Sequence, residues 1–196
     1  MKIKYNYQTF GLKENWINML FLSNNNFITN CNLGKNQIIS FFSYLKDLEL
    51  YYNKKLSDLF FLIKKNKNNK VELWSIFLIN LFFNSPTFFT FTLLPKGKYS
   101  FIDLKNFYIS IFKYNSIRTI NSAITSLLST FENTPIGNDL KIGIIIKEKK
   151  RRSVIKEGGF KFNPYIILYA IYKYSYKYIL FEIDIDKIEN DLFSPQ

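Results

Sequence analysis

Residues 27–52, FITNCNLGKNQIISFFSYLKDLELYY, contain the pattern that decides the predicted fold. Their pattern predicts, in this order, a short helical piece, a turn at Gly34, an amphipathic helix and a short strand. The same order occurs in a winged helix-turn-helix. At 100° per residue, the helix 35–48 has one apolar face and an opposite polar face. The segment therefore predicts a helix that is buried along one side and offers its polar side to a partner.

The two faces of this helix are sorted by residue type. The apolar face, which we expect to be buried, comprises Ile38, Phe41, Phe42, Leu45 and Leu48. The opposite face comprises Asn36, Ser40, Ser43, Tyr44 and Asp47. Recognition helices present N-terminal residues to base edges, and Asn or Gln pairs bidentately with adenine. We predict DNA contacts from Lys35, Asn36, Gln37, Ser40 and Tyr44. An ordinary solvated face is the alternative interpretation, and the acid Asp47 on this face counts against DNA.

Further helices are predicted on both sides of this segment, and a β-hairpin follows them. The helical pattern covers residues 12–22, 57–63, 71–83, 104–112, 116–131 and 165–178, and the hairpin covers 142–155. The apolar-free loop 64–70 is the best candidate boundary. We expect a mainly α chain with small β-hairpins, an α+β class with winged helix-turn-helix-like units. Residues 1–65 form the first unit and residues 71–196 the second, or the two form one continuous domain.

The tip of the predicted hairpin is the most basic stretch of the chain. It holds five cations and one acid, and two of the three arginines of the sequence are adjacent there. A basic wing that follows a phosphate backbone has this composition. A solvated turn in a lysine-rich chain has the same composition. We assign to DNA contact Lys147, Lys149, Lys150, Arg151 and Arg152, and Lys156 extends the strip.

Two smaller groups complete the predicted DNA surface. Lys54 and Lys55 directly follow the short strand. Arg118 lies at the start of the helix 116–131, whose hydroxyl-rich face suits phosphate contacts. Small residues also allow close packing against a partner protein, and that second interpretation is favoured for this helix.

The residues that the chain lacks exclude several catalytic classes. It has no histidine, so a Ser-His-Asp triad and an imidazole metal site are excluded. Its one cysteine, Cys31, can form neither an intrachain disulfide nor a cysteine-rich zinc site. No nucleotide-binding glycine motif is present. We therefore expect no enzyme activity and no cofactor. A metal-dependent nuclease is the weakest alternative, and it would use Asp184, Asp186, Glu189 and Asp191.

Composition indicates a basic, folded protein. Lys and Arg number 27 against 15 Asp and Glu, a formal net charge of +12, and 47% of the residues are hydrophobic. Part of the lysine excess is attributable to an AT-rich genome. Anionic partners suit such a charge. No apolar h-region and no membrane-spanning run is apparent, so a cytoplasmic location is expected, with no membrane partner.

Several stretches resemble an uncharacterised bacterial domain family found beside phosphoadenosine-phosphosulfate-reductase-like proteins in DNA phosphorothioate-modification and anti-phage defence islands. Gly34-Lys35-Asn36, which opens the helix to Leu48, resembles the family's hallmark. Tyr7-Gln8-Thr9-Phe10 with Trp16 resembles its opening motif, although Tyr7 stands where the family has histidine. Similar matches cover Trp74 to Pro86, Thr119 to Leu127 and Asn138 to Ile146. The resemblance implies a winged-helix-like, mainly helical accessory protein of a modification or defence system.

Together these observations predict a non-catalytic DNA-binding accessory protein of a bacterial DNA-modification or anti-phage defence system. It would contact duplex DNA through the winged helix and the basic hairpin. Other defence or modification proteins are further expected partners, and an oligomer is compatible with the pattern. The alternative is a protein-interaction adaptor subunit of a larger complex without direct base readout.

Overall fold

The computed structural model describes residues 7–23, 32–65, 69–148, 151–157, 163–180 and 182. It is mainly helical with two small antiparallel sheets, which confirms the predicted α+β class. The helices are α1 (Glu14–Ser23), α3 (Lys35–Asp47), α4 (Asp58–Lys65), α5 (Lys70–Asn84), α6 (Pro86–Thr92), α7 (Phe101–Ile111), α8 (Ile117–Asn133), α9 (Pro135–Asn138) and α10 (Pro164–Tyr178). The strands are β1 (Tyr51–Tyr52), β2 (Lys55–Leu56), β3 (Gly97–Ser100), β4 (Ile144–Glu148) and β5 (Arg151–Lys156).

The helices predicted at residues 12–22, 35–48 and 57–63 form, as does the short strand that follows the second of them, whereas residues 27–31 of the expected short helical piece lie outside the described residues. Helices α1 and α3 pack together, with the rings of Trp16 and Phe41 5.3 Å apart. A tight hairpin, β1–β2, follows α3, and its two turn residues, Asn53 and Lys54, both have positive φ. Two-residue hairpin turns require that conformation because it matches the twist of the strands. Helix α4 then closes this half of the molecule.

One hydrophobic core runs through the two units predicted from the sequence. Its buried members extend from Tyr7 to Val154. Helix α5 lies at its centre, as its nearly continuous apolar sequence predicts, and buries Trp74, Phe77, Leu78 and Leu81. The shared core supports the interpretation of residues 7–157 as one continuous domain.

The larger sheet has one strand more than the sequence pattern predicted. Its order is β3–β5–β4, and β3 pairs with β5 between Gly97↔Lys156 and Ser100↔Ser153. The hydrophobic pattern predicts no strand at residues 97–100. Four residues such as Gly97–Ser100 carry too little periodicity to be distinguished from a turn, and pairing with the distant β5 makes them a strand.

Two helices begin at residues whose side chains cap them. Ser100 and Asp103 form a reciprocal capping box at α7. The side chain of Asn163 caps α10, with Pro164 in the first turn. These contacts satisfy backbone N–H groups that a helix cannot pair internally.

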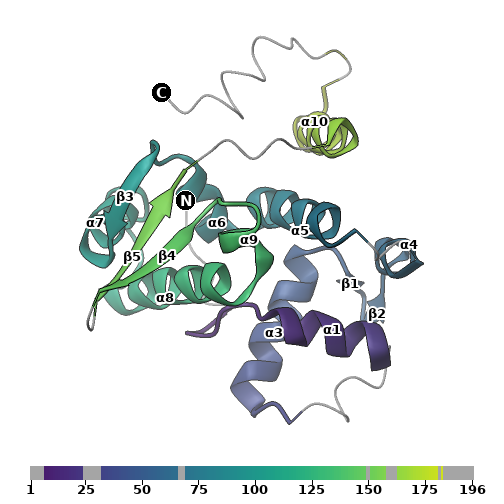
Figure 1. Cartoon of the computed structure of the whole chain (residues 1–196), viewed down its shortest axis with the longest axis horizontal. Coiled ribbons are helices and arrows are strands. Elements are labelled where there is room, and N and C mark those ends of the chain that lie inside the picture. Colours follow the sequence, from purple (N-terminus) through teal and green to yellow (C-terminus); the bar gives the residue numbers. More distant parts are fainter. Residues whose placement is uncertain are drawn as a thin grey trace.

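Figure 1 shows how these elements are distributed. The β3–β5–β4 sheet lies with α7 and α8 on the left. Helices α1, α3 and α4 and the β1–β2 hairpin form the lower right, and α5, α6 and α9 lie between the two groups. Helix α10, seen nearly end-on, lies above α5.

Candidate nucleic-acid interface

The buried side of α3 differs from the side predicted by its hydrophobic pattern. Phe41 and Leu45 are buried as predicted, but Ser40 and Tyr44 are buried too, with 0% of each exposed. Ile38 is only half-buried. The prediction that Ser40 and Tyr44 face DNA is therefore wrong for this conformation. The buried face of α3 includes part of its predicted polar face, because a second segment of the chain covers that part.

The covering segment is residues 7–12, which run between α3 and α8. The hydroxyl of Ser40 donates to the carbonyl oxygens of Tyr7 (2.9 Å) and Phe10 (3.3 Å). The hydroxyl of Tyr44 lies 3.2 Å from the carbonyl oxygen of Phe10 and 3.1 Å from Oγ1 of Thr130. These contacts form a buried polar seam, which we define as Tyr7, Ser40, Tyr44 and Thr130. The seam joins α3 to α8.

Close approach of this segment to α8 depends on Gly11. A Cβ at that position would lie 2.4 Å from the backbone nitrogen of Thr130. The next residue, Leu12, donates its backbone N–H to Oγ1 of Thr130 (2.9 Å). Ser122 and Ser126 of α8 are buried as well. The hydroxyl face of α8, for which packing on a partner protein was the favoured interpretation, is instead buried within the chain at these residues.

The two tyrosines of the seam stay protonated. Their rings stack at 4.0 Å with an interplanar angle of 7°. Burial, followed by the negative charge of Asp47, raises the pKa of Tyr7 well above its usual value. Burial likewise raises the pKa of Tyr44. The hydroxyl of Tyr7 donates a short hydrogen bond to the carboxylate of Asp47. The acid that counted against DNA binding therefore points toward the seam.

Rotation of α3 leaves a different set of side chains facing solvent. We define the α3 stripe as Lys35, Asn36, Ile39, Ser43 and Lys46. Four of the five are exposed and Ser43 is half-buried. The stripe holds two lysines and no carboxylate, and it extends about 16 Å at 1.5 Å per residue. Sequence reasoning missed Ile39 and Lys46 because they lie at the border of the predicted polar face.

The two amide side chains predicted to contact DNA, those of Asn36 and Gln37, have different surroundings in the first turn of α3. The side chain of Asn36 is exposed. Gln37 is half-buried, and its amide oxygen accepts the backbone N–H of Gly34 (3.1 Å). Asn36 is therefore accessible to a ligand, whereas Gln37 serves to begin the helix.

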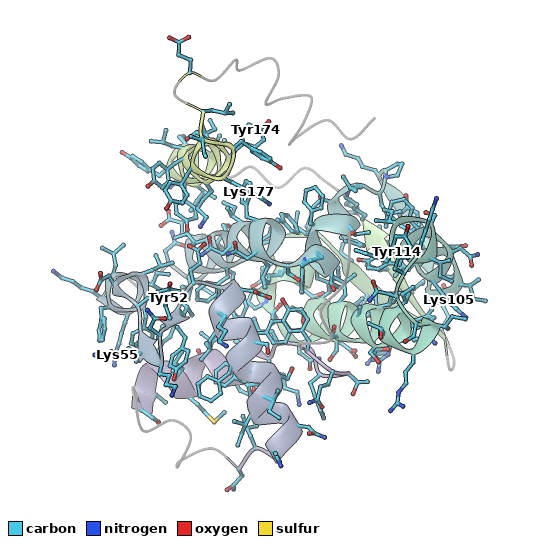
Figure 2. All side chains as sticks on the ribbon, turned by 180° about the vertical axis from the view of Figure 1, so that it is seen from behind. Tyr52, Lys55, Lys105, Tyr114, Tyr174 and Lys177 are labelled. Carbon is cyan, nitrogen blue, oxygen red and sulfur yellow. The ribbon has the colours of Figure 1, made fainter. Side chains whose placement is uncertain are left out.

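The β1–β2 hairpin lies beside the α3 stripe. The ring of Tyr51 is 5.0 Å from that of Phe42, a neighbour of the stripe on α3. Tyr52 faces Lys55 across the hairpin, and both are exposed (Figure 2). With Lys54 at the turn, two of the predicted lysines flank the C-terminal half of α3. Each strand has only two residues, so the hairpin stops short of Lys35.

The basic β4–β5 hairpin forms a separate surface. Lys147 and Arg152 face each other across the strands. Both pair with Glu132 of α8, which lies 3.4 Å from the guanidinium of Arg152. Glu148 pairs with Lys98 of β3 at 2.7 Å. These ion pairs anchor the hairpin to α8 and β3. Lys149, Lys150 and the side chain of Arg151 lie outside the described residues.

Lys156 does not extend this basic strip. Its ammonium group donates to the carbonyl oxygens of Thr92 (2.7 Å) and Leu94 beyond the end of α6. Burial, with a smaller contribution from Lys96, lowers the pKa of Lys156 to about 8. The residue therefore satisfies carbonyl groups inside the molecule.

The predicted site residues thus fall into separate groups. Lys35 and Asn36 lie at the start of α3. Lys54 and Lys55 belong to the β1–β2 hairpin that follows this helix. Arg118 is exposed in the first turn of α8, and Lys147 and Arg152 lie on the sheet. Figure 1 places the strands β4 and β5 on the left and α3 in the lower centre. The α3 stripe with the β1–β2 hairpin is the largest group of adjacent candidates.

Among the described residues, no group of three or more metal-ligating side chains could hold an ion. The C-terminal acids considered for a nuclease lie outside these residues. No single described helix is long and apolar enough to cross a bilayer, and α5 with α6 reaches that composition only across a 101° bend. Comparison with protein-family models, curated proteins and solved structures finds no match for the chain.

Proposed function

We propose that the chain is a non-catalytic protein that binds duplex DNA through the α3 stripe, with the β1–β2 hairpin as a small wing. The observation that carries the proposal is the chemistry of the exposed side of α3. It combines cations at both ends with Asn36 and contains no acid. The resemblance of the Gly34-Lys35-Asn36 segment supports a role as an accessory of a DNA-modification or defence system.

Each member of the surface matches a chemical group of DNA. Lys35 and Lys46 match phosphates on either side of a groove, and Asn36 can pair with adenine. Ile39 offers an apolar contact for a thymine methyl group. The major groove is about 12 Å wide and admits one α-helix. The N–H groups at the start of α3 add a positive partial charge next to Lys35.

A salt-dependence titration tests the proposal. The double variant Lys35→Ala, Lys46→Ala should flatten the slope of log affinity against log salt by about 0.9 for each phosphate that is no longer neutralised. The matched control, Lys96→Ala with Lys113→Ala, removes two exposed lysines elsewhere and the same charge. Its slope should stay close to that of the wild type. Equal effects of the two pairs would show that only net charge matters and would contradict a defined surface.

Base readout is tested separately from phosphate contact. Replacing Asn36 by Ala should cost about 1–3 kcal/mol on a preferred site found by selection from random duplexes. It should leave non-specific binding nearly unchanged. A uniform loss on all sequences would mean that α3 only positions the protein on the backbone.

A further inference from the structure

Helix α10 is attached to the molecule by a small interface. Its buried residues, Ile166 and Ala170, form a cluster with Ile79 that is separate from the main core. The partly buried Ile76, Phe83 and Tyr169 pack against this cluster. Polar contacts join Asn163 to Glu72, Tyr169 to Asn80, Lys173 to Glu49, and Lys177 to the carbonyl oxygen of Phe83. A helix of 15 residues gains little stability alone, so its outer side is available for a second packing surface.

The outer side of α10 is aromatic and apolar. A single stripe, which we call the α10 stripe, comprises Tyr165, Leu168, Tyr172, Tyr176 and Ile179. Tyr165 and Ile179 are each 79% exposed and Tyr176 is 74% exposed. The rings of Tyr172 and Tyr176 stack 6.2 Å apart. Spacings of three and four residues place the helical members on one face.

This face carries no charge, although the chain has a net charge of +12. The two charged residues of α10 are both turned toward the body of the molecule. Lys173 pairs with Glu49, and Lys177 lies over the rings of Phe83 and Phe89 at 5.4 and 5.7 Å (Figure 2). A phosphate backbone requires cations on the surface that it meets. The α10 stripe therefore fits a partner surface that is uncharged and apolar.

The spacing of the stripe is symmetric about Tyr172. Leu168 and Tyr176 lie four residues before and after it, and Tyr165 and Ile179 lie seven residues before and after it. In an antiparallel pair with a two-fold axis at Tyr172, Leu168 meets Tyr176 of the other copy, and Tyr165 meets Ile179. A two-fold interface requires this kind of self-complementary patch.

The tyrosines of the stripe supply about half of the area of a standard interface. Tyr165, Tyr172 and Tyr176 are 60–79% exposed. At about 150–250 Å² for a whole aromatic side chain, these three present roughly 400 Å². Leu168 and Ile179 add exposed apolar surface on the same side. A standard interface takes about 800 Å² from each partner.

We propose that the chain forms a homodimer in which α10 pairs antiparallel with α10 of a second copy, about an axis at Tyr172. Figure 1 shows α10 at the edge of the molecule, so its pairing keeps the two basic bodies apart. Their residual repulsion is screened by salt over a Debye length of about 8 Å at physiological ionic strength. Dimerisation should therefore strengthen as salt rises, opposite to DNA binding.

Disulfide trapping tests the antiparallel arrangement, in a Cys31→Ser background that removes the native thiol. Tyr172→Cys should cross-link to itself under mild oxidation. Leu168→Cys alone should not cross-link, because its two copies would lie about 12 Å apart along the helix axis. That distance is beyond the reach of a disulfide. A mixture of Leu168→Cys and Tyr176→Cys chains should yield the mixed dimer. Self-cross-linking of Leu168→Cys, or none with Tyr172→Cys, would overturn the arrangement.

Sedimentation equilibrium of the full chain tests dimerisation without oxidation. The wild type should change from monomer to dimer with concentration, and Leu168→Lys with Tyr172→Lys should raise the dissociation constant at least tenfold. The control, Ile102→Lys with Tyr114→Lys, adds the same charge at exposed apolar positions elsewhere and should dimerise like the wild type. A monomeric wild type up to about 100 µM overturns the proposal. Binding to neutral vesicles or to another protein that requires the α10 stripe would then identify a different occupant.

Discussion

Helices α3 and α10 use similar residue types in opposite ways. Both contain aromatic residues and lysines, but α3 buries Phe41 and Tyr44 and exposes Lys35 and Lys46. Helix α10 exposes Tyr165, Tyr172 and Tyr176 and turns its lysines toward the body. The difference follows from their surroundings. Helix α3 is covered on two sides, whereas α5 is the one described helix with which α10 makes a substantial contact. Composition therefore says little about which chemistry a helix presents to solvent.

The inward lysines of α10 show why its polar side can be the buried one. Lys177 donates to the carbonyl oxygen of Phe83 (3.0 Å) near the C-terminal end of α5. A helix C-terminus carries a negative partial charge and unpaired carbonyl groups. A lysine placed there satisfies them, which leaves Tyr165, Tyr172 and Tyr176 on the outside.

The largest expected difference between the two helices is in stability. Phe41→Ala should lower the free energy of unfolding by about 3–5 kcal/mol, because it opens a cavity in the main core. Ile166→Ala of α10 should cost less than about 2 kcal/mol, because its cluster contains only three buried residues. Urea denaturation measures both. Similar losses for the two variants would mean that α10 is as integral to the fold as α3.

Exchanging the surface chemistry should separate the two proposed functions. Ile39→Glu places an acid in the α3 stripe and should weaken DNA binding about tenfold, or roughly 1.4 kcal/mol, by repulsion from phosphates. Leu168→Glu on α10 should leave DNA affinity per chain unchanged when it is measured well below the dimer dissociation constant. Fluorescence anisotropy with a labelled duplex measures both. A tenfold loss with Leu168→Glu would place DNA on α10 instead.

The polar seam under α3 should contribute to stability and not to DNA affinity. Tyr44→Phe removes a hydroxyl that contacts Phe10 and Thr130, and it should cost about 1 kcal/mol of unfolding free energy. Ser43→Ala on the outer side should cost less than about 0.5 kcal/mol. Thermal melts and DNA titrations of both variants provide the check. Reduced DNA affinity of folded Tyr44→Phe would contradict the burial of this face.

The smallest expected effect is a pH dependence at the inner side of α10. Burial, followed by the charge of Glu49, raises the pKa of Tyr169 to about 12. The unfolded chain loses this proton near pH 10. Stability from the protonated hydroxyl is therefore complete below pH 10 and decreases between pH 10 and 12. Tyr169→Phe should show a shallower decrease than the wild type in urea denaturation across this range. Parallel curves would contradict the assignment.

Local sequence signals account for much of the secondary structure. The 3.6-residue periodicity predicted α3 and α8, and α7 and α10 begin at the local capping residues Ser100, Asp103 and Asn163. These signals work because caps and amphipathic patterns act between residues close in sequence. The same locality explains the missed β3, whose pairing partner lies more than fifty residues away.

The sequence by itself determined that the chain folds, is basic, and lacks imidazole chemistry, since these depend on which residues are present. Only the tertiary structure decided which side of α3 meets solvent. Residues 7–12 cover Ser40 and Tyr44 and satisfy their hydroxyl groups, so polar residues that resemble a ligand face become part of the interior. It likewise decided that the lysines of α10 turn inward. A buried polar group is stable only with a partner, and partners from distant segments are supplied by the fold.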